Sequence, residues 1–66
     1  MRMKGQIKFY KMERGYGFIT GEDCKDYFFH FKEIMNKEFL SKDDLVEFKP
    51  DSNEKGLVAK EIFKRE

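Results

Sequence analysis

The 66-residue chain has no tryptophan, and it contains only one cysteine, one histidine and one proline. Because Cys24 is the single cysteine, no disulfide can form within the chain, which is typical of proteins in a reducing compartment. One cysteine and one histidine are too few for a structural zinc site. No apolar run approaches the roughly 20 residues that a membrane-spanning helix needs. We therefore expect a cytoplasmic protein that binds no metal ion or other cofactor and no membrane.

Charge of one sign is not in excess either, since 14 lysines and arginines stand against 13 aspartates and glutamates, a net charge of +1. The total charge therefore does not indicate a polyanionic partner, and any basic surface must arise from local arrangement. Aromatic residues are abundant, with eight phenylalanines and three tyrosines. At this length we expect a single domain over residues 1–66. Eleven aromatic rings are more than the core of so small a domain ordinarily needs.

Short segments rich in strand-forming residues alternate with turn signals along the chain. We expect five strands, at residues 4–12, 15–20, 26–31, 44–50 and 57–66. The connections should be loops or turns, except that residues 31–44 should contain a short helical turn before a long loop. Residues 57–66 also fit a helical period, but the turn cluster at 51–56 favours a strand. A sheet of such short strands buries a core only by curling, so we expect an all-β closed barrel.

The segments GYGFIT (15–20) and DYFFHF (26–31) place rings on both faces of neighbouring strands. Because side chains alternate along a strand, Ile19 and Phe29 should point into the barrel. Four rings should then share the outer face: Tyr16, Phe18, Phe28 and His30. The glycines between rings let the sheet coil sharply. Rings gathered in solvent need a partner, and the bases of single-stranded nucleic acid can stack on them.

Three segments in close succession, KGQIKFY, ERGYGFIT and DYFFHF, resemble the cold-shock domain family. The resemblance extends from Gly5 to about Ile62. It implies a five-stranded antiparallel barrel of the oligonucleotide-binding (OB) type, which binds single-stranded RNA and DNA, melts weak RNA structure and is not an enzyme. The RNA-recognition motif shares the pattern of residues 14–19, but Gly21 stands where that motif has an aromatic residue, and the chain does not supply its two helices.

The resemblance assigns nucleic-acid contacts to residues within these segments and beyond them. They are Lys8, Phe9, Arg14, Tyr16, Phe18, Asp26, Phe28, His30, Phe31, Phe39 and Lys55. The aromatic rings should stack on bases, and the basic side chains should lie near phosphates. Strict alternation from Ile7 would bury Phe9, so its place on the outer face requires a bulge or strong twist between Lys8 and Tyr10. Phe9 stands where the family has tryptophan, and Leu57 stands where it often has proline.

These features predict an ATP-independent RNA chaperone that binds single-stranded RNA or DNA, favours pyrimidine-rich strands and has a role in regulating transcription or translation during stress. We expect a monomer, with strand exchange as a route to a dimer, and no small-molecule substrate. Two alternatives are a protein-interaction module that uses the same rings and a ribonuclease centred on His30. The second would need an acid beside the histidine, and Asp26, four residues away on the same strand face, is too distant to orient it.

Overall fold

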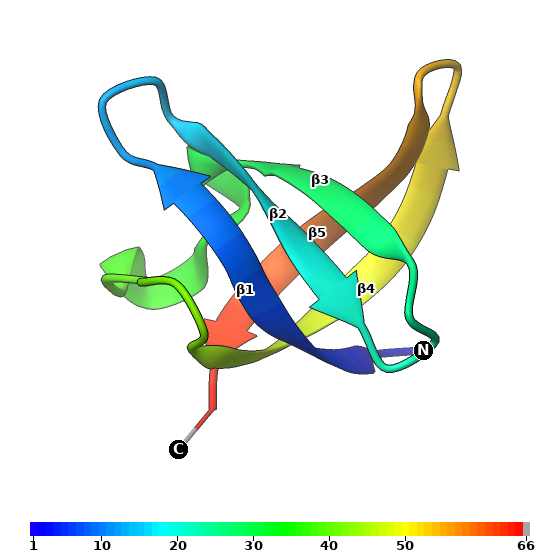
Figure 1. Ribbon diagram of the computed structural model, residues 1–66, viewed down its shortest axis with the longest axis horizontal. Coiled ribbons are helices and arrows are strands. Elements are labelled where there is room, and N and C mark those ends of the chain that lie inside the picture. The colour runs from blue at the N-terminus through cyan, green and yellow to red at the C-terminus, as the bar shows by residue number, and fades with distance from the viewer. Residues whose placement is uncertain (66) are drawn as a thin grey trace.

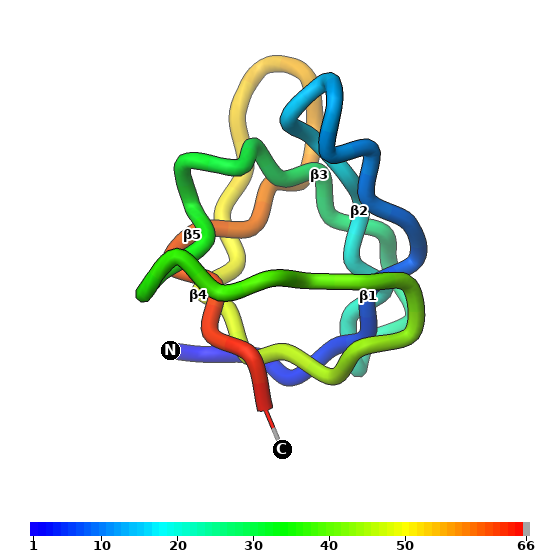
Figure 2. Tube along the Cα trace, turned by 90° about the vertical axis from the view of Figure 1, so that its left-hand side faces the viewer, coloured from blue at the N-terminus to red at the C-terminus, as the bar shows by residue number. Residues whose placement is uncertain are grey.

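The computed structural model describes residues 1–65, which form one closed barrel of five strands. The strands are β1 (Met3–Lys11), β2 (Tyr16–Gly21), β3 (Asp26–His30), β4 (Leu45–Asn53) and β5 (Gly56–Lys64). Two 3₁₀ turns, Phe31–Glu33 and Met35–Lys37, lie between β3 and β4, and this connection crosses one end of the barrel (Figure 1, Figure 2). In this part of the chain no helix is long and apolar enough to cross a membrane.

The strands follow the order β1-β2-β3-β5-β4 around the barrel. Neighbouring strands are antiparallel except β3 and β5, which are parallel and pair at Phe28 and Val58. The all-β, OB-type barrel is thus confirmed, and its predicted antiparallel pairing holds for every neighbouring pair except β3 and β5. The reason is topological. Strand direction cannot alternate all the way round a closed ring of five strands, so one neighbouring pair must be parallel.

The interior is filled by side chains that alternate along the strands. The buried residues are Ile7, Ile19, Tyr27, Phe29, Leu40, Val46, Phe48, Ala59 and Ile62. Ile19 and Phe29 are 0% and 1% exposed, which confirms their predicted place inside. The buried Tyr27 donates its hydroxyl hydrogen to Asp23 Oδ2 at 2.8 Å, and this bond lowers the pKa of Asp23 and raises that of Tyr27. Tyr10 packs against this core, with its ring 5.3 Å from that of Phe29, and the other rings lie outside it.

Two strand boundaries near the rings differ from the prediction by one residue. Gly15 lies in the turn at residues 12–15, where its φ of 75° is a conformation that glycine adopts readily and other residues rarely do. Phe31 does not extend β3 but begins the first 3₁₀ turn, because the His30 side chain accepts a hydrogen bond from the Lys32 N–H and caps that turn. The predicted helical turn after β3 is therefore present, and a parallel bridge between Ile34 and Ile62 joins it to β5.

The fourth strand is longer than predicted. It continues past Pro50 to Asn53, so residues 51–53 are strand rather than turn, and only residues 54–55 form the turn into β5. Proline is tolerated there because β1 pairs with β4 only from Leu45 to Phe48, which leaves the Pro50 edge without a neighbour on that side. The hairpin of β4 and β5 consequently projects beyond the other strands (Figure 1). Residue 66, the last of the predicted fifth strand, lies outside the described residues.

Candidate nucleic-acid interface

A β-bulge in β1 brings Phe9 to the outer face of the barrel. The register between β1 and β2 pairs Ile7 with Ile19 but Phe9 with Phe18, so Lys8 is an extra residue in β1. Such an insertion reverses the face of every residue after it. Ile7 is therefore fully buried, while the Phe9 ring lies outside with its centroid 5.4 Å from that of Phe18. The bulge that the sequence required for an outward Phe9 is present.

Four rings form a continuous surface over β1, β2 and β3, which we call the ring platform: Phe9, Phe18, Phe28 and Tyr16, each in contact with the next, and Tyr16 in edge contact with Phe9 at 6.5 Å. Successive ring centroids are 5.4, 5.6 and 5.8 Å apart. At these distances the rings stabilise one another by edge and stacking contacts. All of them are only partly buried, so the platform keeps ring surface open to solvent.

The glycine between Tyr16 and Phe18 is required by what lies beneath it. A Cβ at Gly17 would overlap the carbonyl oxygen of Phe9 and would lie 2.8 and 2.9 Å from two atoms of the buried Phe29 ring. Glycine thus lets β1 and the Phe29 ring approach β2 closely, while Tyr16 and Phe18 point outward on either side. The alternation of rings and glycines in GYGFIT therefore builds an outer aromatic surface on a tightly coiled sheet.

The remaining predicted rings lie beyond the Tyr16 side of the platform. His30 is the cross-strand partner of Tyr16, but its ring packs against Phe31, with centroids 4.7 Å apart, rather than on the platform itself. Phe31 is 50% exposed and Phe39 is 79% exposed. The structure does not bring Phe39 to the platform, and it lines a separate hollow of about 360 Å³ together with Phe31 and Met12.

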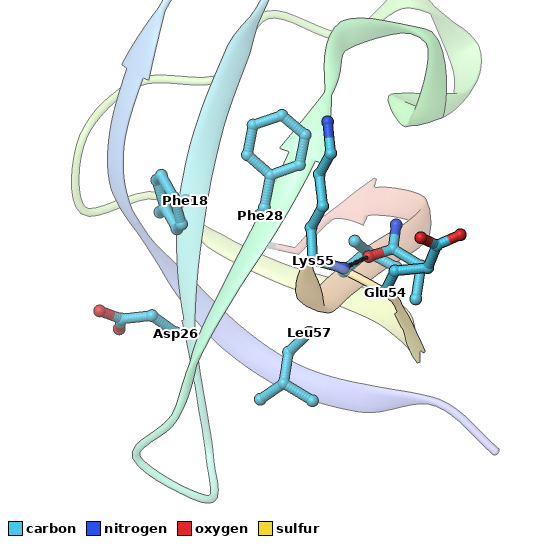
Figure 3. Close-up of a pocket in the computed structure, with 8 residues that line it drawn as sticks. Phe18, Asp26, Phe28, Glu54, Lys55 and Leu57 are labelled. Atoms are coloured by element: carbon cyan, nitrogen blue, oxygen red, sulfur yellow. Dashed lines mark hydrogen bonds between the residues drawn. The ribbon is translucent and has the colours of Figure 1, made fainter.

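A larger hollow, of about 770 Å³, lies beside Phe18 and Phe28, between the platform and the β4–β5 hairpin. Its lining consists of Phe18, Asp26, Phe28, Asn53, Glu54, Lys55, Leu57 and Val58. Figure 3 shows Lys55 extended beside the Phe28 ring, with Leu57 on the other side of the opening. The hairpin residues other than Lys55 were not among the predicted contacts. The short turn at residues 54–55 is the sequence signal that could have identified them. It was missed because the fourth strand was expected to end at Pro50 and residues 51–56 were expected to form a turn.

The charged side chains at the interface differ in whether they already have partners. Lys8 Nζ lies 2.7 Å from Asp26 Oδ2, and the Thr20 hydroxyl donates to Asp26 Oδ1 at 3.1 Å. The hydrogen bond from Lys8, followed by that from Thr20, lowers the pKa of Asp26. Among the described residues, Arg14 and Lys55 form no ion pair. Two of the three predicted phosphate contacts are thus free, and the third is held by a carboxylate.

The one histidine and Asp26 each already have a hydrogen-bond partner. Among residues 1–65 the hydrogen-bond partner of His30 is the backbone N–H of Lys32, and Asp26 is engaged by Lys8 and Thr20 rather than by the histidine. The described part of the chain has no group of three or more histidine, cysteine, aspartate or glutamate side chains placed to hold a metal ion. What the site offers is flat aromatic surface, two hollows and free positive charge.

Comparison with known proteins agrees with this geometry. The family model described as "'Cold-shock' DNA-binding domain" matches residues 3–65. Cold shock-like protein CspC of Buchnera aphidicola is 38% identical over 65 residues, which cover 94% of each chain. The major cold shock protein of Micrococcus luteus is 41% identical over 63 residues, covering 91% of this chain and 94% of the relative.

The same relationship is visible among solved structures. A Drosophila chain described as Unr CSD456 matches with a TM-score of 0.83 and 31% identity. The match covers 100% of this chain but 27% of the Drosophila chain, so the present chain spans about a quarter of that chain's length. This chain belongs to the cold-shock domain family, a family of nucleic-acid-binding domains.

Proposed function

We propose that this protein binds single-stranded RNA and DNA by stacking successive bases on the ring platform, and that it acts as an ATP-independent RNA chaperone in the cytoplasm. The observation that carries the proposal is the series of partly exposed rings, with centroids 5.4 to 5.8 Å apart, on a barrel whose interior is already full. Stacking on an aromatic side chain supplies about 1–3 kcal/mol per base. Several bases in succession therefore supply affinity without sequence-specific hydrogen bonds.

We propose that the bound strand continues past the platform on two sides. On one side His30 and Phe31 offer two further rings, and the exposed Phe39 offers another across the smaller hollow. On the other side the larger hollow is walled by Phe18 and Phe28 and has the Lys55 side chain beside it. A base in this hollow would lie against rings, with its phosphate within reach of the lysine.

Phosphate contacts would come first from Arg14 and Lys55, because these side chains form no ion pair among residues 1–65. Lys8 would contribute only in competition with Asp26. Each phosphate neutralised on a single strand lowers the slope of log K against log salt concentration by about 0.7. Two or three phosphates therefore predict a slope of about −1.4 to −2.1, shallow for a nucleic-acid-binding protein. Stacking, rather than net charge, would dominate the affinity.

Chaperone activity would follow from binding only the unpaired form of RNA. A protein that binds one of two exchanging states shifts their equilibrium by mass action, by an amount set by its free concentration relative to Kd. Bases inside a helix cannot stack on side chains, so the platform favours the open state of a weak hairpin. No nucleotide hydrolysis is needed, and regulation of transcription or translation would result where such a hairpin controls either process.

The test is the opening of a weak RNA stem–loop that carries a fluorophore and a quencher at its ends. The wild-type protein should raise the fluorescence without ATP, and the Tyr16→Ala/Phe18→Ala variant should not. Phe63→Ala is the matched control, because it removes a ring that packs under Arg2 and does not belong to the platform. Equal opening by the wild type and the double variant would refute the stacking mechanism. Failure of the wild type to open the hairpin would refute the chaperone role.

A further inference from the structure

His30, the last residue of β3, is held by the turn that follows it. Its Nδ1 accepts a hydrogen bond from the Lys32 backbone N–H at 3.3 Å and so caps the turn Phe31–Glu33. Its ring lies 4.7 Å from the Phe31 ring, and the planes are inclined by 36°. The Phe31 N–H donates to the carbonyl oxygen of Gly15 at 2.8 Å, which ties this backbone to the turn between β1 and β2. The orientation of the imidazole is therefore set by the fold.

The contact with Lys32 also decides which ring nitrogen carries the hydrogen in neutral His30. A neutral imidazole has one donor nitrogen and one acceptor nitrogen. A backbone N–H can only donate, so Nδ1 is the acceptor and the hydrogen resides on Nε2. The side chain is exposed, and within residues 1–65 its one hydrogen bond is the one at Nδ1. Nε2–H is thus a free donor at the end of the ring series.

We propose that the Lys32 N–H makes His30 a hydrogen-bond donor, through Nε2, to a carbonyl oxygen of a bound base. This inference rests on the proposed nucleic-acid function and adds a specificity-determining contact to it. Thymine, uracil, cytosine and guanine carry a carbonyl oxygen, and adenine does not. The strand position next to His30 should therefore favour a carbonyl-bearing base, although the rest of the path accepts any base that stacks.

Two observations favour a base over a phosphate as the partner of Nε2–H. The first is that rings flank His30, with Phe31 in contact and Tyr16 opposite it across the strands. A base stacked on either ring directs its polar edge sideways, toward the neighbouring side chain. The second is that Arg14, one residue before Gly15, is exposed and forms no ion pair among the described residues. A permanent positive charge near this end would hold a phosphate more strongly than a neutral imidazole would.

The experiment replaces one thymine at a time in a short oligothymidine by difluorotoluene, which has the shape of thymine but no carbonyl oxygen. Binding is measured at pH 8 for every strand and variant. At one position the wild type should lose about two- to tenfold in affinity relative to the other positions, the range expected for one hydrogen bond. His30→Phe, which keeps a ring but no donor, should show no such position.

A second variant separates the capping role from the donor role. His30→Asp retains a side-chain oxygen that can accept from the Lys32 N–H, since aspartate is a favoured capping residue, and its ionised carboxylate has no hydrogen to donate. It should unfold at the wild-type temperature and yet lack the position-dependent loss. Because His30 is the only histidine, its ring nitrogens can also be assigned without ambiguity in nitrogen-15-labelled protein. A hydrogen on Nδ1 in the neutral form would overturn the inference.

The outcomes distinguish this inference from the proposed function. Tight binding of the unmodified strand, with the same losses in wild type and His30→Phe at every position, would overturn the donor role alone. An absence of binding to the unmodified strand would overturn both. A loss confined to one position in the wild type and abolished in both variants would establish the contact.

Discussion

Replacing Gly17 by alanine tests the packing that supports the ring platform. The added Cβ would overlap the carbonyl oxygen of Phe9 and would lie 2.8 Å from Cζ of Phe29. Neither group can yield easily, because the carbonyl belongs to the paired strand β1 and the Phe29 ring is 1% exposed. Overpacking of a core ordinarily costs about 1–3 kcal/mol. Because a backbone atom must shift as well, we expect a cost at the upper end of this range.

The net effect should be large for so small a domain. Alanine has less conformational freedom than glycine in the unfolded chain, and this difference alone raises the free energy of unfolding by about 0.4–1 kcal/mol. The free energy of unfolding should therefore fall by about 2 kcal/mol in total. A chain of this length has a total stability of about 3–10 kcal/mol, at about 0.05–0.15 kcal/mol per residue. Urea unfolding followed by far-ultraviolet circular dichroism measures the change, since the chain has no tryptophan for a fluorescence signal.

Gly21→Ala provides the matched comparison. The atoms nearest to a Cβ at Gly21 are Asp23 Oδ1 and Met3 Sδ, each at 2.7 Å, so no backbone atom has to move; the Met3 side chain can rotate away, and Asp23 can shift by loosening its hydrogen bonds with Tyr27 and Lys25. This variant should therefore lose clearly less stability than Gly17→Ala. If Gly17→Ala were as stable as the wild type, or more stable than Gly21→Ala, the close approach of β1 and Phe29 to this glycine would be refuted.

The remaining predictions concern one cation–π contact and the charges of the interface. Arg2→Ala should lower the free energy of unfolding by about 1 kcal/mol, measured in urea, because its guanidinium lies 4.8 Å from the centre of the Phe63 ring. Arg14→Gln should make the salt dependence of oligonucleotide binding shallower by about 0.7, and Lys8→Gln should change it less, because Lys8 is paired with Asp26. The pKa of Asp26 is lowered in the folded state, chiefly by its hydrogen bond from Lys8, so its contribution to stability is present at neutral pH and is lost as the pH falls below about 4. Thermal unfolding of Asp26→Asn should therefore show a weaker loss of stability in acid than the wild type, and an equal loss would contradict this assignment.

Much of the barrel could be predicted because its local patterns agree with one another. Alternation alone placed Ile19 and Phe29 inside and Phe18 and Phe28 outside, since a strand has only two faces. The bulge was predictable for a related reason. A buried Ile7 and the outward Phe9 that the family resemblance implies cannot coexist in a regular strand, so a bulge or a strong twist was expected there, and the structure has the bulge.

What could not be predicted depends on how distant segments meet. The ion pair of Lys8 with Asp26 joins β1 to β3 across β2, and it exists only with the register that the bulge creates. The hollow beside Leu57 depends on a hairpin that continues past Pro50, and a proline in a strand pattern ordinarily marks its end or an edge. The exposed Phe39 lies outside the platform because the long connection crosses the end of the barrel (Figure 2).

The measurement that tests the central claim most directly is fluorescence anisotropy of a labelled seven-base oligothymidine, titrated at low and moderate salt. The wild-type protein should bind with a shallow salt slope, and Tyr16→Ala/Phe18→Ala should lose most of the affinity, because each lost stacking contact costs about 1–3 kcal/mol. Phe63→Ala should bind as the wild type does. Equal binding by the double variant would show that the ring platform does not hold the bases. An absence of binding by the wild type would contradict the account as a whole and would favour a protein as the partner of the rings.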